Sequence, residues 1–270
     1  MFKRIKHKLR QVMGRTDRSG QVSIRFPGGI RPISETLAED IFIVGFPKSG
    51  NTLMQHIIAH LVYGINEESS RTMVNLIVPD IYANSHYFRM NDVCYFKSHE
   101  LPQPQYKKVI YIMRDGREAL LSFYHMRKNM GHDISLEELY SGKLKIFNTT
   151  WQEHIQQWES NPFEAEILWL KFEDLKLKKE KELKKICKFL NIERSDDEIK
   201  KVVDLTSFHH MKKLEARKDW VKMKNSASFK SGFFMRKGKV NSYLDEVSKE
   251  IIKEFERSNN QVLKRYYNEL

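Results

Sequence analysis

The chain has 270 residues, of which 40% are hydrophobic and 11% aromatic, which is enough to bury the core of one α/β domain. Its two cysteines, Cys94 and Cys187, lie far apart with no histidine or cysteine neighbour at metal-ligand spacing, so neither a disulfide framework nor a zinc site is indicated. The formal net charge of +12 favours an anionic partner, which composition alone leaves open between a nucleotide, a sulfated or phosphorylated ligand, a membrane surface and a nucleic acid.

Residues 1–35 are polar and basic, with several glycines and prolines, and predict a loosely held N-terminal arm in front of a single domain over residues 36–270. The first residues, MFKRIKHKLRQVMGR, form either a basic amphipathic helix suited to weak contact with an anionic membrane surface or a frayed terminus. We find neither an apolar run long enough to span a membrane nor a cleavable signal pattern. We therefore expect a soluble, cytoplasmic protein.

Three β-rich runs follow in the chain, and each leads into a helical pattern. Residues 41–44 end at Gly45, and an apolar stripe at helical spacing begins near Ser49. Residues 109–113 precede a helical segment after Gly116, and residues 167–172 precede a lysine-rich helix over 176–190. Residues 244–270 are expected to form one closing helix. This alternation predicts an α/β fold with a mainly parallel central sheet flanked by helices.

The segment from Gly45 to Thr52 has the GxxxxG spacing of a phosphate-binding loop and lies between a predicted strand and a predicted helix. Glycines allow the backbone N–H groups to turn inward, and the start of the following helix adds unpaired N–H groups and a positive dipole end. Nucleoside triphosphate loops carry lysine directly after the second glycine, whereas this chain has Asn51 there and Lys48 inside the bend.

The stretch FPKSGNTL resembles the 5′-phosphosulfate loop of the cytosolic-type sulfotransferases, which runs approximately YPKSGTTW. The resemblance implies a P-loop-like nucleotide-binding core in which Lys48 contacts the leaving oxygen. It further implies that the phosphate cradle is formed by Ser49, Gly50, Asn51 and Thr52. Leu53 stands where the family often has a tryptophan stacked on adenine, so an apolar contact is expected there without a ring stack.

YFKSHELP, residues 95–102, is similar to the family's KTHLP stretch. Lys97 and His99 fill the places of the lysine and of the histidine that acts as general base. A neutral imidazole is suited to that role, because the acceptor hydroxyl has a pKa far above neutrality and must lose its proton as it attacks sulfur.

RDGREALLS, residues 114–122, resembles the 3′-phosphate motif, in which an arginine at a strand end is followed eight residues later by a serine. Arg114 and Ser122 match that interval, and the planar guanidinium is suited to donating two hydrogen bonds to a phosphate. The alternative for Arg114 is a salt bridge with Asp115 or Glu118. The resemblance also implies that Ser122 engages Lys48.

Three further segments complete the resemblance, which spans residues 41 to about 243 in the family's order. Phe172 in LKFEDL replaces a tyrosine that usually meets the base. LTSFHHMKK resembles the TSFxxM stretch, so its aromatic and apolar members belong either to an adenine pocket or to ordinary core. FMRKGKV resembles RKGxxG, but the expected continuation GDWK is replaced by NSYL. The residues concerned are Thr206, Phe208 and Met211, and Arg236, Lys237 and Gly238.

The resemblance implies transfer of a sulfuryl group from 3′-phosphoadenosine-5′-phosphosulfate (PAPS), with 3′-phosphoadenosine 5′-phosphate (PAP) as product and no metal. The acceptor is a hydroxyl or amine of an unidentified small molecule, lipid or glycan, bound by loops near residues 64–95, 125–150 and 215–235. The alternatives are a P-loop kinase or NTPase, a non-catalytic polyanion-binding protein, and a sulfotransferase that has lost activity. Candidate acceptor contacts are Tyr82, Tyr87, Phe88, Phe147 and Trp220.

Overall fold

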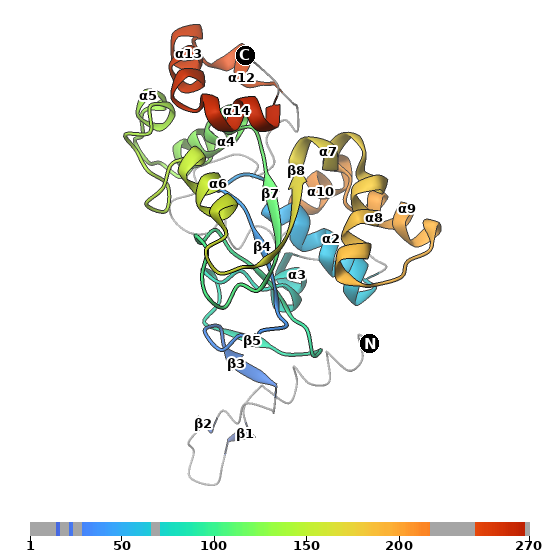
Figure 1. The fold of residues 1–270 in the computed structure, drawn as a ribbon. Helices are drawn as coiled ribbons and strands as arrows, with labels where there is room; N and C mark the ends of the chain where they lie inside the picture. Colours follow the sequence, from blue (N-terminus) through green and yellow to red (C-terminus); the bar gives the residue numbers. More distant parts are fainter. Residues whose placement is uncertain (1–14, 17–21, 24–28, 66–70, 217–240, 268–270) are drawn as a thin grey trace.

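A computed structural model describes residues 15–16, 22–23, 29–65, 71–216 and 241–267. Its centre is a four-stranded parallel sheet with the strand order β6-β4-β7-β8 (Figure 1). The strands are β4 (Ile41–Val44), β6 (Tyr95–Lys97), β7 (Lys108–Met113) and β8 (Glu166–Lys171). The predicted α/β class and the three predicted strands are confirmed, and β6 adds a short strand within the KSH segment.

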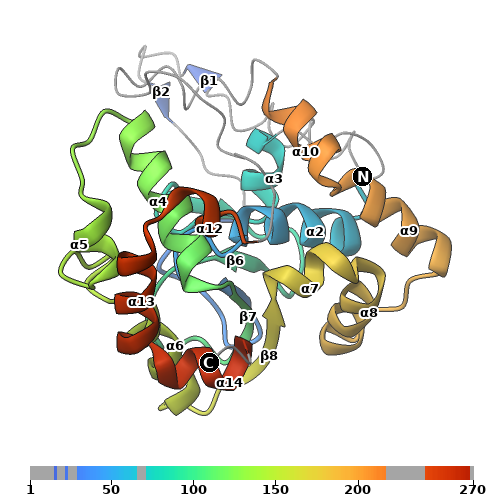
Figure 2. The same cartoon turned by 90° about the horizontal axis from the view of Figure 1, so that it is seen from above.

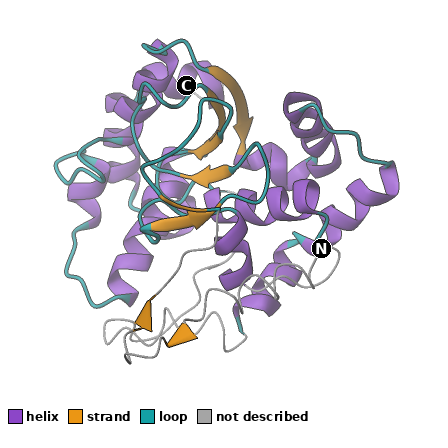
Figure 3. Ribbon diagram, turned by 90° about the horizontal axis from the view of Figure 1, so that it is seen from below, coloured by secondary structure: helices purple, strands orange, loops and turns teal. Residues whose placement is uncertain are grey.

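Helices cover both faces of this sheet, as the views from above and from below show (Figures 2 and 3). On one face lie α2 (Asn51–Tyr63), α3 (Arg71–Ile77), α7 (Phe172–Leu177), α8 (Lys179–Leu190), α9 (Asp196–Leu205) and α10 (Phe208–Glu215). On the other lie α4 (Gly116–Asn129), α5 (Leu136–Tyr140), α6 (Trp151–Ser160), α12 (Tyr243–Glu246), α13 (Lys249–Ser258) and α14 (Asn260–Tyr267).

Alternation along the strands builds two separate cores. In β4, Phe42 and Val44 join the core under α4, α6 and α13, whereas Ile41 and Ile43 join the core under α2 and α8. Successive side chains of a strand point to opposite faces, so a strand covered on both faces must be apolar throughout. All four residues of β4 are accordingly buried. This explains why continuous apolar runs identified the central strands.

Two helix predictions were wrong in their boundaries. The segment expected to form one helix over residues 176–190 is divided between α7 and α8, because the backbone at Lys178 leaves the helical region at φ −133° and ψ 40°. The single helix expected over residues 244–270 is instead three helices. Ser248 starts α13 by accepting a hydrogen bond from the Ile251 N–H, and Asn259 separates α13 from α14.

The end of the predicted N-terminal arm is held by strand pairing. Strand β3 (Ile30–Pro32) pairs with β5 (His86–Phe88) in antiparallel register, and β1 (Arg15–Thr16) pairs with β2 (Val22–Ser23). The amphipathic helix predicted near the start of the chain lies outside the described residues. None of the described helices is both long enough and apolar enough to cross a bilayer. The division into an arm and a domain stays a prediction.

Candidate active site

A cavity of about 450 Å³ opens where the four parallel strands end. Its wall includes a residue from the carboxyl end of each strand or from the loop that follows it, which is where open α/β sheets bind ligands. These residues are Lys48, Lys97, Arg114 and Phe172. The structure thus brings together predicted site residues from four segments that are distant in sequence.

The phosphate loop adopts a backbone conformation that needs glycine. Gly50 has φ +112° directly before α2, and a Cβ atom there would lie 2.6 Å from Cδ2 of Phe172. Lys48 itself has φ 72°, so the loop bends back at the lysine. The bend is tied to β6, because Asn51 Nδ2 donates a hydrogen bond to the Ser98 carbonyl at 3.0 Å. The loop therefore places the N-terminus of α2 toward the cavity.

Gly50→Ala is expected to abolish measurable PAP binding, because the new methyl group must displace Phe172 from the cavity wall while the backbone keeps a left-handed conformation. Isothermal titration calorimetry with PAP measures this. Gly64→Ala is the matched control, since Gly64 also has positive φ, at +60°, but has no atom within 4 Å of a Cβ. Equal loss of PAP affinity in both variants would assign the effect to backbone strain alone.

Lys48 lies at the cavity wall with its Nζ 3.8 Å from Sδ of Met126. Burial, followed by the nearby charges of Arg114 and Lys97, lowers the pKa of Lys48 to about 7. Because a neighbouring anion favours the charged form of an ammonium group, an anionic ligand in this cavity would reverse the effect. The lysine is therefore placed to respond to an anion.

His99 is held in one tautomer by the phosphate loop. Its Nδ1 lies 2.7 Å from the Gly45 carbonyl oxygen, and because that oxygen only accepts, Nδ1 carries the proton. Burial and the charge of Lys97 lower the pKa of His99 to about 3. The ring is therefore neutral near pH 7, and its unprotonated Nε2 is the nitrogen left to act as a base.

Sequence reasoning missed His154, which supports His99 from α6. His154 Nε2 donates to the His99 carbonyl at 3.2 Å, and its Nδ1 accepts from the Tyr111 hydroxyl at 2.7 Å. The His154 side chain is fully buried. In the sequence of α6, it lies between the buried residues Trp151 and Trp158. A polar residue within that apolar stripe was the available signal.

Stability is expected to fall as the pH drops below about 6.5, the ordinary histidine pKa. Burial lowers the pKa of His56 to about 3 and that of His154 to about 4, so the folded chain keeps both rings neutral while the unfolded chain protonates them. Each ring contributes a slope of about 1.4 kcal/mol per pH unit between these limits. Urea unfolding at pH 7.5 and 5.5 measures the slope. His154→Gln should reduce it, and equal stability of the wild type at both pH values would contradict the expectation.

Arg114 forms the salt bridge considered for it from sequence, while its contact with a 3′-phosphate stays a prediction. Its Nη2 donates to Oε2 of Glu118 at 3.1 Å, so the predicted salt-bridge alternative is present. Its Nη1 donates to the Lys48 carbonyl at 3.0 Å, and the guanidinium lies 4.6 Å from the centre of the Phe172 ring. The arginine also lines the cavity. It therefore connects the phosphate loop, the Phe172 wall and α4.

Glu118, which the sequence suggested only as a possible salt-bridge partner of Arg114, has a larger role in the structure. Its buried carboxylate also accepts hydrogen bonds from the Ser242 hydroxyl and the Tyr243 N–H, both at 3.1 Å. Those residues follow the predicted segment of Arg236, Lys237 and Gly238, which lies outside the described residues. Glu118 therefore holds the chain after that segment beside Arg114.

Among the described residues, the other predicted nucleotide contacts line the cavity with the exception of Ser49. The hydroxyl of Ser49 is buried and has no hydrogen-bond partner among the described residues. The Thr206 hydroxyl donates a hydrogen bond to the Val202 carbonyl at 2.6 Å, and the Thr206 carbonyl accepts one from Lys179 Nζ at 2.6 Å. A hydrogen bond between Ser122 and Lys48 stays a prediction. The lining members are Gly50, Asn51, Thr52, Leu53, Ser122, Phe172, Thr206, Phe208 and Met211.

The cavity wall is strongly cationic. Six Lys or Arg side chains but only two acidic side chains, Asp80 and Glu118, line its described part. Such an excess attracts an anionic ligand. Three of the six cations had no motif to mark them in the sequence. The basic residues are Lys48, Arg71, Lys97, Arg114, Lys176 and Lys179.

The part of the cavity beside His99 is aromatic. The rings of Tyr82 and Phe147 have their centres 6.1 Å and 5.7 Å from the imidazole, and Phe123 and Met126 add further apolar surface. Two of the predicted acceptor contacts, Tyr82 and Phe147, are therefore at the cavity. Tyr87 was a wrong prediction, because it is buried in the core against Phe96. Phe88 is not part of the lining, and Trp220 lies outside the described residues.

In the described part of the chain, no three His, Cys, Asp or Glu side chains are grouped so as to hold a metal ion. The residues that could hold a nucleotide are those of the phosphate loop, Arg114 and the apolar wall near Phe172.

Comparison with known proteins identifies the family. Its model, the sulfotransferase domain, matches residues 38–267. The amine sulfotransferase of Oryctolagus cuniculus is 24% identical over 237 residues, covering 81% of this chain and 79% of that protein. Sulfotransferase 1B1 of Mus musculus is 27% identical over 197 residues, covering 64% of this chain and 65% of that protein.

Solved structures show the same fold. A retinol dehydratase bound to retinol and PAP superposes with a TM-score of 0.69 at 17% identity, covering 85% of this chain and 82% of that one. Mouse sulfotransferase SULT7A1 bound to PAP gives a TM-score of 0.62 at 23% identity, covering 87% and 90%. With a family model that matches most of the chain and neighbours that share its parallel sheet, this chain belongs to the sulfotransferase domain family.

Proposed function

We propose that this chain transfers a sulfuryl group from PAPS to a hydroxyl or amine of an acceptor with an apolar body. The observation that carries the proposal is the shared geometry of Lys48 and His99. Both line one cavity, and the carbonyl of Gly45 in the lysine's own loop fixes the imidazole as the Nδ1–H tautomer. A base and a cation suited to a leaving oxygen are thus held together.

The cavity fits the donor nucleotide. Gly50 leaves room for Phe172 where a Cβ would lie 2.6 Å from its ring, so a flat apolar wall stands directly beside the loop. Leu53, Phe208 and Met211 add apolar surface for a base, and the six lining cations suit the phosphate and sulfate groups. PAP is also the nucleotide bound to retinol dehydratase and to SULT7A1.

When bound, PAPS supplies a sulfuryl group attached to a phosphate oxygen that leaves with the bonding electron pair. Nε2 of His99 accepts the proton that the acceptor loses as its oxygen or nitrogen bonds to sulfur. Lys48 and the N-terminus of α2 stabilise the negative charge that develops on the leaving oxygen. Lys97 lies beside them. We assign the 3′-phosphate to Arg114, Ser122 and the segment of Arg236, Lys237 and Gly238.

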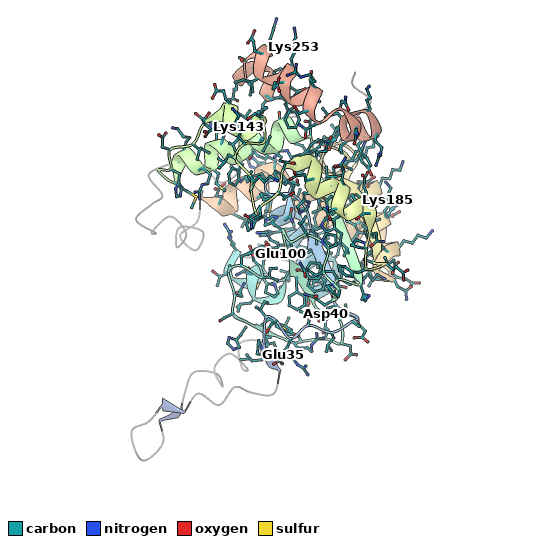
Figure 4. The ribbon with its side chains drawn as sticks, turned by 60° about the vertical axis from the view of Figure 1, so that its left-hand side comes forward. Glu35, Asp40, Glu100, Lys143, Lys185 and Lys253 are labelled. Atoms are coloured by element: carbon teal, nitrogen blue, oxygen red, sulfur yellow. The ribbon has the colours of Figure 1, made fainter. Side chains whose placement is uncertain are left out.

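The alternative functions have weaker support. A P-loop kinase requires a lysine directly after the second loop glycine, and Asn51 occupies that position with its amide bonded to Ser98. The polyanion-binding alternative rests on the net charge of +12, and the sequence contains no recognised nucleic-acid-binding motif. Of its surface lysines, Lys143, Lys185 and Lys253 lie far apart (Figure 4). Retention of both Lys48 and His99 favours an active enzyme over an inactive relative.

Transfer of ³⁵S from labelled PAPS to a panel of phenols, alcohols, amines and glycans tests the proposal. We expect labelled product with at least one acceptor and PAP as the second product. If the chain binds neither PAPS nor PAP by calorimetry, the proposal is wrong. Hydrolysis of ATP that depends on Mg²⁺ would support the kinase alternative instead.

A further inference from the structure

The turn between α3 and β5 is fastened to β6 next to the candidate base. The Lys97 N–H donates to the Pro79 carbonyl at 2.8 Å, and the Ile81 N–H donates to the Lys97 carbonyl at 3.1 Å. Asp80 and Lys97 therefore pair as a bridge beside the main sheet. The turn is closed by the N–H groups of Ala83 and Asn84, which both donate to the Asp80 carbonyl at 3.1 Å. Asp80 is fixed at both its backbone and its side chain.

The carboxylate of Asp80 contacts two parts of the site at once. Its Oδ2 lies 2.6 Å from Nζ of Lys97, and its Oδ1 accepts from the Tyr82 N–H at 3.0 Å. The side chains of Lys97 and Asp80 are only 9% and 15% exposed, so this ion pair is largely removed from water. The Tyr82 ring in turn stacks beside His99, and its hydroxyl donates to Glu100 at 2.9 Å.

The Lys97 ammonium is buried among other positively charged or titratable groups, so it needs a negative partner to stay charged. Arg71 from α3, Lys48 from the loop after β4, and His99 directly beyond β6 all lie within electrostatic reach of it. Burial and Arg71 lower the pKa of Lys97, whereas the Coulomb attraction and hydrogen bond of Asp80 raise it. Removing one partner of a buried pair leaves the other charge uncompensated. Asp80 forms the ion pair with this ammonium.

We infer that Asp80 is a positioning residue for sulfuryl transfer, which holds the Lys97 ammonium toward the transferred sulfonate while fixing the turn that carries the Tyr82 ring against His99. This inference rests on the proposed function. It assigns Asp80 no contact with the reacting atoms and makes its effect depend on Lys97. The sequence offered no motif for it, because Asp80 lies 17 residues before its partner.

Asp80→Asn separates the two contacts, because the amide oxygen still accepts from the Tyr82 N–H while the ion pair with Lys97 is lost. We expect kcat to fall on the order of tenfold at pH 8, with a smaller loss at lower pH, because removing the Asp80 charge lowers the pKa of Lys97 further. Asp80→Glu keeps the charge and should recover part of the rate. Asp133→Asn is the matched control, since Asp133 forms an exposed ion pair with Lys128 at 3.2 Å.

A double-mutant cycle with Lys97→Met shows whether Asp80 acts through that lysine. We expect Asp80→Asn to cause no further loss of kcat once Lys97 is gone. Multiplying losses in the double variant, or an unchanged kcat in Asp80→Asn, would overturn the inference. If Asp80→Asn does not fold, Asp80→Glu in the same cycle decides between the two results.

A binding measurement separates this inference from the proposed function. PAP lacks the sulfonate, so Asp80→Asn should weaken PAPS binding at pH 8 on the order of tenfold while changing PAP binding by less than about twofold. Calorimetry with PAP and with PAPS needs no acceptor and no turnover. Equal changes for both nucleotides would reject the role of Asp80 even if the wild type is active. Failure of the wild type to transfer sulfate, with the selective loss of PAPS affinity intact, would reject the proposed reaction only.

Discussion

His99→Ala is expected to lower kcat for sulfuryl transfer by about 100- to 10,000-fold, the usual contribution of a positioned general base. The imidazole is held as the Nδ1–H tautomer by Gly45, and burial lowers its pKa to about 3, so the wild type has an unprotonated Nε2 throughout the neutral range. Alanine supplies no proton acceptor there. Steady-state rates from pH 6 to pH 9, with an acceptor found in the panel, measure the effect.

Two controls make the His99 result specific. His86→Ala removes an exposed histidine of β5, away from the cavity lining, and should leave kcat unchanged. PAP affinity of His99→Ala, measured by calorimetry, should remain within about threefold of the wild type, because the ring is assigned to the acceptor side. Wild-type kcat in His99→Ala would remove this histidine as the base.

Lys48→Ala is expected to lower kcat by about 100- to 1,000-fold, comparable to the loss of one group that stabilises a developing oxyanion. Burial and neighbouring cations lower the pKa of Lys48 to about 7 in the free protein. A lysine with that pKa loses its charge as the pH rises, so wild-type kcat/KM should decline above about pH 7. The pH profile of Lys48→Arg should lack this decline, since arginine stays charged.

Lys143→Ala is the matched control for Lys48, because Lys143 is an exposed lysine that is not part of the cavity lining. Its kcat and its PAP affinity should match those of the wild type. Retained activity in Lys48→Ala would contradict the assigned role, and an alkaline decline that persists in Lys48→Arg would assign the titration to another group.

The parts of the fold that the sequence predicts well are those with strong local patterns. Residues 41–44 and 109–113 are apolar on both faces, and such runs identify strands buried between two helical layers. The phosphate loop could be located because its two glycines and Lys48 lie within one short segment of the sequence. The helix that follows the loop, α2, was predicted to begin near Ser49, whereas it begins at Asn51. The left-handed backbone of Gly50, which precedes the helix, cannot be read from residue spacing.

The closing segment was harder, because its apolar spacing continues across two interruptions. Ser248 and Asn259 are polar residues that a continuous amphipathic helix would tolerate on its exposed face. Only the packed structure shows that Ser248 caps α13 and that Asn259 bonds back to the Phe255 carbonyl at 2.8 Å. Local sequence therefore predicted helix but could not predict how many.

Several site residues could not be predicted because their roles depend on contacts between distant segments. Arg71 and Asp80 lie away from every motif, and Lys179 belongs to a lysine-rich segment in which nothing distinguishes it from surface lysines. Tyr87 shows the reverse case, since an aromatic residue in a predicted acceptor loop is buried in the core. In each case the tertiary environment determines the role, and a residue type in a loop leaves that environment undefined.

The hydrogen bond from His99 Nδ1 to the Gly45 carbonyl links the orientation of the proposed base to the conformation of the phosphate loop. Gly45 is the first residue of the predicted phosphate loop, and a Cβ there would lie 2.4 Å from the Ile112 carbonyl oxygen, so this residue packs tightly against the neighbouring strand. A shift of this loop would move the Gly45 carbonyl and thereby change the orientation of the His99 imidazole. In the proposed mechanism, a substitution that distorts this peptide unit would therefore disturb both donor binding and proton transfer.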